Sequence, residues 1–516
     1  MSNETPIPMP QRAVAIIGAG PAGLVAGAWL ARQGFEPVLF EAADELGGQW
    51  NAASPMSGAW PGMHTNTSRV MTAFAELDHA PGTPAFPTQE EMLQYLRRYA
   101  AQAGLLPRLR LGTRVECLSR SEAGQGWILR SRGGGEFRVE HFARVVVATG
   151  RYNSPSIPEV PGLGSFAGAG GVSHGFDYAG PAAYRGRSVV IAGCSISALE
   201  IASELALAGA RRVTVTLRRQ RYVLQKLTGG VPTDHVAFTR FAALAGGALP
   251  PAAVAEGLRR LVVSSAGSPE QAGAPQPDAD IFAAGLTQSQ HYLSLVAEGR
   301  IRVRPWISEV AGQRVGFADG SAEADTDALI FGTGYRLSLP FLAPEIRQAL
   351  DLDDQHIDLH DHTFHPELDG LAFLGLFDQA GPYFPVLELQ ARWLAYAWSG
   401  VVAPPGPAAM REGIAACRAG RGGPQMLPMH AMALLFARNA GVEPDPDLWP
   451  ELRRALLFGP LSPASFRLTG PDRRSDAAAR TLADAARFGC VSSPEMTAEE
   501  AARWEMVRSL LQADAA

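Results

Sequence analysis

The chain has 516 residues, enough for two to three domains of ordinary size, and its 47% hydrophobic and 19% charged residues are typical of a globular protein. Its net charge of −6 argues against a nucleic-acid partner, because phosphate binding needs clustered lysine and arginine. The four cysteines lie far apart with no CxxC pair, which excludes a disulfide-reductase pair and a zinc knuckle and favours a reducing compartment.

The sequence predicts no targeting or membrane segment. Residues 1–12 lack the basic and apolar regions of a signal peptide. No run of about 18 or more apolar residues is present, so no membrane span is expected. Residues 497–516 predict an amphipathic, charged helix rather than an anchor. We therefore expect a cytoplasmic protein without a membrane partner.

Residues 13–48 predict a strand, a glycine turn, a helix and a second strand. In the turn, Gly18 permits the tight bend, Gly20 lets the backbone approach a pyrophosphate, and Gly23 lets the helix pack closely. Glu41 closes the second strand where such units use an acid for the ribose hydroxyls. The alternative is a glycine turn in an ordinary βαβ unit. The predicted cofactor-binding residues here are Gly18, Gly20, Pro21, Ala22, Gly23 and Glu41.

Residues 188–221 repeat this order of strand, turn, helix and strand. Serine and alanine replace the second and third glycines of the turn. Ser195 limits how closely the backbone can approach a phosphate, although its hydroxyl can itself donate a hydrogen bond. The predicted cofactor-binding residues of this turn are Gly193, Ser195, Ser197 and Ala198.

The second strand of this unit ends in Arg218 and Arg219, where the first unit has Glu41. A guanidinium there suits a 2′-phosphate through charge-assisted, bidentate hydrogen bonds, which favours NADPH over NADH. A solvated basic turn is the alternative, and the nearby Arg221 is consistent with it. An acid in the first unit and arginines in the second indicate FAD first and NADPH second.

Two similar strands mark where the chain crosses between these units. Each ends in an Ala/Gly-Thr-Gly turn, with Gly150 and Gly334 as predicted cofactor contacts through close backbone approach. The expected fold class is α/β, with two Rossmann-like domains, the FAD domain interrupted by the NADPH domain, and a C-terminal helical extension. The expected boundaries are 1–165 for the first part of the FAD domain, 166–326 for the NADPH domain with an insertion at about 222–290, 327–403 for the second part of the FAD domain, and 404–516 for an extension packing on it.

Motifs spread over residues 12–475 carry a family resemblance. They are Gly47-Gly48-Gln49-Trp50, HTNTSRVM, FPTQEEMLQYLRRYA, the ATG strand at 148–150, Phe166-x-Gly168 with His174-x-x-x-Tyr178, FGTGY at 331–335, ELQARW at 388–393 and FGPLSPASFRLTGP at 458–471. Together they resemble the flavin-containing monooxygenases, the FAD- and NADPH-dependent group that oxygenates nitrogen and sulfur.

The resemblance implies a defined mechanism. NADPH reduces FAD, oxygen adds at flavin C4a, and the resulting C4a-hydroperoxyflavin oxygenates a nucleophilic atom of a small-molecule substrate. The protein positions the flavin and protects the peroxide, with NADP⁺ retained as a lid. No side-chain nucleophile or metal is needed. The implied partners are the substrate and O2, and a homodimer is compatible with the resemblance.

Asn66 is the catalytic residue that the resemblance implies, because it matches the family asparagine beside the flavin and NADP⁺. The alternative is a loop asparagine that caps a helix. Arg69 is expected in the FAD pocket, whereas a packing role and a cofactor contact both stay open for Arg392 and Trp393. The further cofactor contacts implied are Gly48, Gln49, Trp50, Thr65, Asn66 and Gln390.

Some residues depart from this pattern and leave two other functions open. Trp60-Pro61-Gly62 is similar to a motif of the Baeyer–Villiger monooxygenases, which oxidise ketones, but Asn66 stands where that group has an acid, and Tyr178 where it has tryptophan. An asparagine favours oxygen transfer to nitrogen or sulfur. The other alternative is an NADPH oxidase or a flavoprotein that does not oxygenate a substrate.

Two segments between the motifs carry further expectations. The 222–285 segment includes a stretch rich in serine, alanine and proline, which predicts a mobile insertion. The substrate pocket is expected beside it. His174 lies in a lengthened glycine-rich connector, which favours a hinge residue that bonds across the domain junction over a catalytic base. The residues expected to line the substrate pocket are Tyr222, Phe238, Phe241 and Tyr292.

Overall fold

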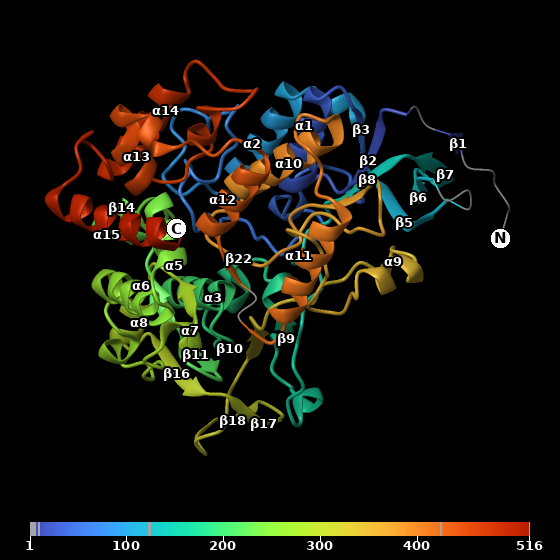
Figure 1. The fold of residues 1–516 in the computed structure, drawn as a ribbon. Helices are drawn as coiled ribbons and strands as arrows, with labels where there is room; N and C mark the ends of the chain where they lie inside the picture. Colours follow the sequence, from blue (N-terminus) through green and yellow to red (C-terminus); the bar gives the residue numbers. More distant parts are fainter. Residues whose placement is uncertain (1–6, 9–10, 122–124, 424–425, 515–516) are drawn as a thin grey trace.

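Two five-stranded sheets form the centre of the protein in this computed structural model, which describes residues 7–8, 11–121, 125–423 and 426–514. Neighbouring strands run parallel in both sheets. The first sheet lies in the upper right of Figure 1 and the second in its lower half. The expected α/β fold with two Rossmann-like domains is thereby confirmed.

The first sheet is sandwiched between helices and a smaller antiparallel sheet. Its central strand β2 (Ala13–Ile17) is wholly buried, as expected of a parallel strand covered on both faces. Val14 and Ile16 pack with the helices, while Ala13, Ala15 and Ile17 pack with the antiparallel sheet. The elements of this domain are β2, β3 (Glu36–Phe40), β4 (Leu109–Arg110), β8 (Arg144–Val147) and β21 (Leu371–Phe373), the helices α1 (Pro21–Arg32), α2 (Gln89–Gln102) and α10 (Phe384–Ser399), and the strands β1 (Ile7–Pro8), β5 (Thr113–Arg120), β6 (Trp127–Gly133) and β7 (Glu136–Phe142).

The second sheet is built in the same way. Val189 and Ile191 of β10 face the core that contains helix α3, and Val190 and Ala192 face a small three-stranded sheet. The elements are β9 (Gly171–His174), β10 (Ser188–Ala192), β11 (Arg212–Leu217), β16 (Ile301–Pro305) and β20 (Ala328–Phe331), the helices α3 (Ile196–Leu207) and α8 (Tyr292–Ala297), and the strands β17 (Ile307–Ala311), β18 (Arg314–Phe317) and β19 (Ala322–Glu323).

The chain crosses twice between the two sheets, and the crossing segments pair with each other. Ser156 N donates to Gly334 O at 3.0 Å, and Arg336 N donates to Ser154 O at 2.8 Å. Strand β21 then completes the first sheet, so the second domain interrupts the first. Strand β20 pairs with β10, so the second sheet extends beyond residue 326, where the division made from the sequence ends it.

The 222–290 insertion is an ordered subdomain, and the expectation of a mobile segment is wrong. Strands β12 and β15 pair in parallel, and α6 packs across them around the buried residues Tyr222, Val262 and Ile281. This separate hydrophobic core stabilises a segment whose composition is typical of a linker. Its elements are β12 (Tyr222–Leu224), β13 (Leu227–Thr228), β14 (Val231–Pro232), α4 (Thr233–Ala237), α5 (Arg240–Ala248), α6 (Pro251–Ala266), α7 (Ile281–Ala284) and β15 (Leu286–Gln288).

The C-terminal extension packs on the first domain and also reaches the insertion. Helix α12 packs on α10, while Val507 of α15 is buried against Phe241 of α5. Figure 1 shows α15 beside α5. In the part of the chain that the structure describes, no helix is long and apolar enough to span a membrane. The remaining elements are α9 (Pro344–Ala349), β22 (Gln379–Ala380), α11 (Pro407–Ala419), β23 (Leu427–Pro428), α12 (Met429–Asn439), α13 (Arg453–Phe458), α14 (Ala477–Ala486) and α15 (Ala498–Asp514).

Candidate functional site

A cavity of about 2340 Å³ opens between the two domains. Both glycine turns, the Asn66 loop, the crossing segments and part of the insertion line it. The volume is more than twice that of a pocket for one drug-sized ligand, typically about 300–1,000 Å³. The predicted site residues that line it are Gly18, Gly20, Pro21, Ala22, Glu41, Gly48, Gln49, Trp50, Thr65, Asn66, Gly150, Gly193, Ser195, Ser197, Arg218, Arg219 and Gly334.

The first glycine turn has the shape needed to bring backbone close to a pyrophosphate. Gly18 has a φ of +108°, and a Cβ placed there would lie 2.5 Å from Ala148 O. A Cβ on Gly23 would lie 1.9 Å from Gly18 O, so Gly23 packs the helix on the turn and does not line the cavity. Helix α1 begins at Pro21 with no side-chain cap. Its first N–H groups are therefore free to bind an anion.

Glu41 stands directly after β3 and is fixed beside this turn. Its Oε2 accepts a hydrogen bond from Ala19 N at 2.8 Å, and its Oε1 accepts one from Ala43 N at 2.9 Å. These bonds hold the carboxylate in the cavity wall with lone pairs left over for a ligand. Both the fixed position and the acceptor chemistry suit ribose hydroxyls.

The second glycine turn is tightened by Ser195. Gly193 has a φ of +131° and faces Gly332, whose carbonyl would lie 2.5 Å from an added Cβ. Ser195 Oγ donates to that carbonyl at 2.8 Å and accepts from Ala198 N at 3.2 Å, which caps α3. The hydroxyl proton thus closes the turn rather than pointing at a phosphate. Ala198 packs against Gly332 and does not line the cavity.

Three arginines follow β11 at the cavity wall. The guanidinium of Arg218 lies 4.6 Å from the ring centroid of Trp306, which restrains an otherwise exposed side chain. Arg219 donates to Ala283 O at 2.8 Å, and Arg221 lies against Gly285. Arg218 thus lines the cavity with its guanidinium over a ring, whereas that of Arg219 bonds a backbone carbonyl.

Asn66 lies in a loop whose backbone is held on both sides. Thr65 N donates to Pro87 O at 2.8 Å, and Ser68 N donates to Asp234 Oδ2 at 2.6 Å. Asn66 itself lines the cavity, and its Oδ1 is buried with no hydrogen-bond partner among the described residues. A buried amide oxygen without a partner is costly, so this position is prepared for a donor from a ligand.

Asp234 and His235 of α4 are site residues that the sequence did not reveal. Asp234 lines the cavity, and His235 Nε2 lies 3.1 Å from Ser68 Oγ. Burial raises the pKa of Asp234 to about 6 and lowers that of His235 to about 4. Phe488 of the C-terminal extension packs edge-on against the His235 ring. The insertion and the extension thus jointly support the Asn66 loop.

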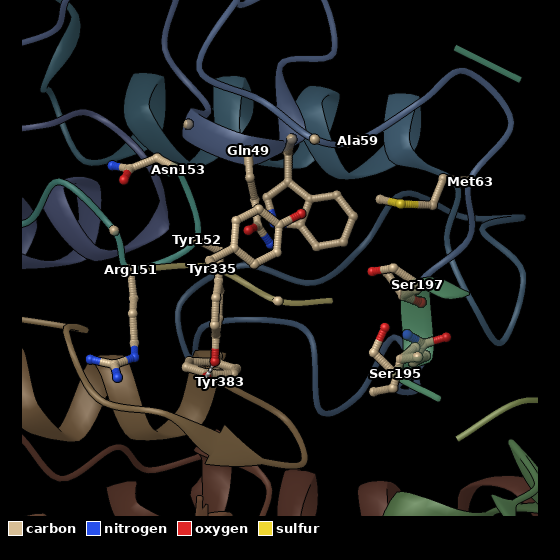
Figure 2. A pocket seen from close by; sticks show the side chains of 18 of the residues that line it. Gln49, Ala59, Met63, Arg151, Tyr152, Asn153, Ser195, Ser197, Tyr335 and Tyr383 are labelled. Atoms are coloured by element: carbon tan, nitrogen blue, oxygen red, sulfur yellow. Dashed lines mark hydrogen bonds between the residues drawn. The ribbon is translucent and has the colours of Figure 1, made fainter. Parts of the chain in front are cut away.

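A second unpredicted group joins Tyr152, Asp378 and Tyr383. Tyr152 donates its hydroxyl proton to Asp378 Oδ1, and its oxygen lies 2.9 Å from the Tyr383 hydroxyl. Burial holds the pKa of both phenols above their usual range, so both stay neutral. Figure 2 shows Tyr152, Tyr335 and Tyr383 together, opposite Ser195 and Ser197. No local motif marks these residues, because 226 positions separate Tyr152 from Asp378.

Two expected cofactor contacts, Gln390 and Arg69, lie outside the cavity lining, and so does Arg392, for which packing is the alternative. Gln390 is fully buried and bonds Gly375 N at 3.0 Å and Thr363 Oγ1 at 2.9 Å, so it orders the end of β21 instead of lining the cavity. Arg69 donates to Thr83 O and packs on Phe488. Arg392 donates to Phe466 O at 2.8 Å. Each of these side chains bonds protein groups away from the cavity, and Arg392 Nη2 is buried without a partner among the described residues.

His174 ends β9 and is buried at the edge of the second sheet. Its Nδ1 accepts from Phe176 N at 3.0 Å, a bond within its own segment, and its ring packs edge-on against Tyr335. Burial lowers the pKa of His174. His174 meets the second crossing segment through the ring of Tyr335 and the backbone of Gly334, whose effect on the His174 pKa opposes that of burial.

The substrate-pocket residues expected from the insertion are mostly internal. Phe238 lines the cavity and lies against Gly381. Tyr222, Phe241 and Tyr292 are buried in three separate hydrophobic cores instead. The insertion therefore reaches the cavity through β12, β13, α4, β15 and the residues next to them, not through its larger helices α5 and α6.

The donor set of the cavity fits two dinucleotides. Two glycine turns, each closed to any Cβ, precede the N-termini of α1 and α3. Asn66 Oδ1 and Thr149 Oγ1 are buried beside the cavity without partners among the described residues. Acceptors at Glu41 and donors at Arg218 complement a ribose and a phosphate.

Comparison with known proteins agrees with this geometry. The flavin-binding monooxygenase-like family model matches residues 11–505. Dimethylaniline monooxygenase (N-oxide-forming) 2 of Rattus norvegicus is 30% identical over 485 residues, covering 89% of each chain. Flavin-containing monooxygenase 5 of Cavia porcellus is 28% identical over 498 residues and 90% of each chain.

Solved structures share the fold. The S-allyl-L-cysteine S-oxygenase from Allium sativum has a TM-score of 0.61 at 22% identity and covers 96% of this chain and 98% of its own. A closed structure of cyclohexanone monooxygenase has a TM-score of 0.62 at 19% identity, covering 85% and 98%. With a family match over nearly its whole length and a relative at 30% identity, the chain belongs to the flavin-binding monooxygenase-like family.

Proposed function

We propose that this chain oxygenates a nucleophilic nitrogen or sulfur atom of a small molecule with NADPH and O2. As a member of its family, it is an oxidoreductase that uses FAD and NADPH. The observation that carries the proposal is the placement of Asn66, with an unpaired amide oxygen, in the cavity that both glycine turns line. The rat relative, named as N-oxide-forming, supports oxygenation of nitrogen.

Each end of the cavity binds one of the two cofactors. The first turn, the α1 N-terminus and Glu41 hold the pyrophosphate and ribose of FAD. The second turn and the α3 N-terminus hold NADPH, and Arg218, restrained by Trp306, binds its 2′-phosphate. When bound, FAD supplies hydride acceptance from NADPH and activation of O2.

Asn66 sets which kind of oxygen transfer the site supports. Its amide donates and accepts hydrogen bonds but carries no negative charge. An uncharged group favours an electrophilic oxygen, which attacks the lone pair of nitrogen or sulfur. Attack on a ketone, as in the Baeyer–Villiger alternative, needs an anionic oxygen that a neutral amide does not by itself promote. The likeness to cyclohexanone monooxygenase is at the level of the fold.

The proposal is tested by giving the FAD-loaded protein and NADPH three substrates: N,N-dimethylaniline, methyl phenyl sulfide and cyclohexanone. We expect N-oxide and sulfoxide in amounts close to the NADPH consumed, and no lactone. Lactone as the main product would establish the Baeyer–Villiger alternative. Hydrogen peroxide equal to the NADPH consumed, with every substrate, would establish an NADPH oxidase.

A further inference from the structure

The carboxylates that line the cavity differ in the groups that neutralise or hydrogen-bond them. Glu41 and Asp234 accept from backbone N–H groups, Glu116 pairs with Arg132 at 2.8 Å, and Glu200 pairs with Lys226 at 3.0 Å. Glu204 accepts from the Tyr178 hydroxyl at 2.8 Å and from the side chain of Trp60, whereas Asp378 accepts from the Tyr152 hydroxyl. Burial raises the pKa of Glu204, which favours its neutral form. Among the described residues, Asp378 is therefore, apart from Glu204, the cavity-lining carboxylate with neither a salt bridge nor a backbone donor to its side chain.

The hydrogen bonds around Asp378 have one direction. Gln379 N donates to the Tyr383 oxygen at 2.9 Å, and Tyr152 donates to Asp378 Oδ1, which leaves Tyr383 as the donor in the contact between the two phenols. The other acceptor of the Tyr383 hydroxyl is Phe377 O, at 3.5 Å. This order uses the protons of both phenols and leaves the other carboxylate oxygen as an acceptor. Arg151 gives its donors to the carbonyls of Leu376 and Gln355, not to Asp378.

Aromatic side chains line the cavity beside the tyrosine that bonds this carboxylate. The ring of Tyr335 packs edge-on against Tyr152, with 5.6 Å between centroids, and the ring of Tyr383 lies against Phe377. Figure 2 shows Tyr152, Tyr335 and Tyr383 from three separate segments on one side of the cavity. A carboxylate oxygen among aromatic rings is the environment that binds organic cations.

We propose that Asp378, with the rings of Tyr152, Tyr335 and Tyr383, is a subsite for a cationic group of the substrate, such as an ammonium. This proposal rests on the proposed function and adds a substrate class to it. A protonated nitrogen has no lone pair and cannot accept oxygen, so the cation held at Asp378 is not the reacting atom. The substrate carries two functional groups, a cation for anchoring and a neutral amine or thioether for oxygenation.

The test uses two probes that share one thioether and differ in charge. 2-(Methylthio)ethylamine is protonated at pH 7.5, since alkyl amines titrate near pH 10, and 2-(methylthio)ethanol is its neutral counterpart. Binding to the FAD-loaded protein is measured by calorimetry, and sulfoxide formation is measured separately. We expect the ammonium probe to bind roughly tenfold to a hundredfold more tightly, as a charge-assisted hydrogen bond allows.

Asp378→Asn removes the charge and keeps the shape, and it should abolish this preference by weakening only the ammonium probe. Glu116→Gln, which removes a charge from the cavity wall outside the cluster, should keep the preference. Tyr383→Phe leaves the carboxylate but frees Tyr152, and it should weaken the ammonium probe by a smaller factor. If Asp378→Asn fails to bind FAD, the affinity of Tyr383→Phe for the two probes tests the subsite in its place.

The outcomes separate the subsite from the function. Equal affinity of the two probes for the unaltered protein, or equal loss of both in Asp378→Asn, would overturn the subsite while sulfoxide formation still upheld the function. Selective ammonium binding that depends on Asp378, without any sulfoxide, would uphold the subsite and overturn the function.

Discussion

Asn66 is held by its neighbours while its own amide oxygen is left without a partner in the described structure. Asn66→Asp should lower N-oxide formation from N,N-dimethylaniline roughly a hundredfold, because a negative charge replaces a hydrogen-bond donor beside the reacting oxygen. The flavin should still be reduced by NADPH, with the oxygen released as hydrogen peroxide. Asn153→Asp, a matched change elsewhere on the cavity wall, should cost less. Undiminished N-oxide formation by Asn66→Asp would remove Asn66 from the chemistry.

Arg218 lines the cavity and lies against the Trp306 ring. Arg218→Ala should raise the KM for NADPH roughly tenfold or more, the worth of a charge-assisted hydrogen bond, and leave the KM for NADH unchanged. The preference for NADPH over NADH should therefore narrow. Arg314→Ala, an exposed arginine paired with Glu309 in the same domain, serves as the control. A preference unchanged by Arg218→Ala would assign the 2′-phosphate to another residue.

Sequence reasoning placed some site residues well for a physical reason. The glycines and Glu41 follow from local spacing, since a turn between strand and helix constrains only neighbouring positions. Tyr152, Asp378 and Tyr383 share no such spacing, because separate segments bring them together. Gln390 shows the opposite failure. It lies in a family motif, yet its amide is consumed by Gly375 and Thr363.

At the scale of elements, helix α4 of the insertion fixes the Asn66 loop through Asp234. Asp234→Ala should leave Ser68 N without its acceptor and loosen the loop, so that more NADPH is spent on hydrogen peroxide than on product. Asp234→Asn retains an acceptor oxygen for Ser68 N, so it should divert less NADPH to hydrogen peroxide than Asp234→Ala does. Asp278→Ala, at an exposed turn of the same insertion, provides the control. Equal coupling in all three variants would show that α4 does not position the loop.

The segment around Arg467 ties the C-terminal extension to the first domain. Arg467 pairs with Glu76 at 2.7 Å, and both side chains are less than a tenth exposed. Arg467→Ala should lower the free energy of unfolding by about 1.5–3 kcal/mol, because the buried Glu76 loses one of two charge-assisted hydrogen bonds and keeps only the one from Arg32 at 2.8 Å. Arg480→Ala, whose partner Asp78 is 82% exposed, should cost less than about 1 kcal/mol. Urea unfolding measures both, and equal losses would contradict this account.

The insertion shows why element-scale predictions from composition can fail. Its serine, alanine and proline content is that of a linker, but Tyr222, Val262 and Ile281 are far apart in sequence and form a core only once β12, α6 and α7 assemble. A sequence pattern predicts single helices and strands, whereas the stability of this segment comes from packing between them.

At the scale of the whole molecule, both Rossmann-like domains were predictable, because each repeats a local unit. Their junction was not. Trp60 of the first domain packs edge-on against Tyr178 of the second, and the two crossing segments pair through Ser156 and Gly334. These contacts depend on how two separately folded units meet. They lie at the cavity between the two domains, in which we propose that FAD, NADPH and the substrate meet.

The most direct test of the central claim is transfer of labelled oxygen. FAD-loaded protein is supplied with NADPH, N,N-dimethylaniline and ¹⁸O2, and the N-oxide is analysed by mass spectrometry. The account predicts one ¹⁸O atom in each N-oxide molecule and about one product per NADPH oxidised. Absence of labelled N-oxide, with all the label recovered in hydrogen peroxide, would contradict it.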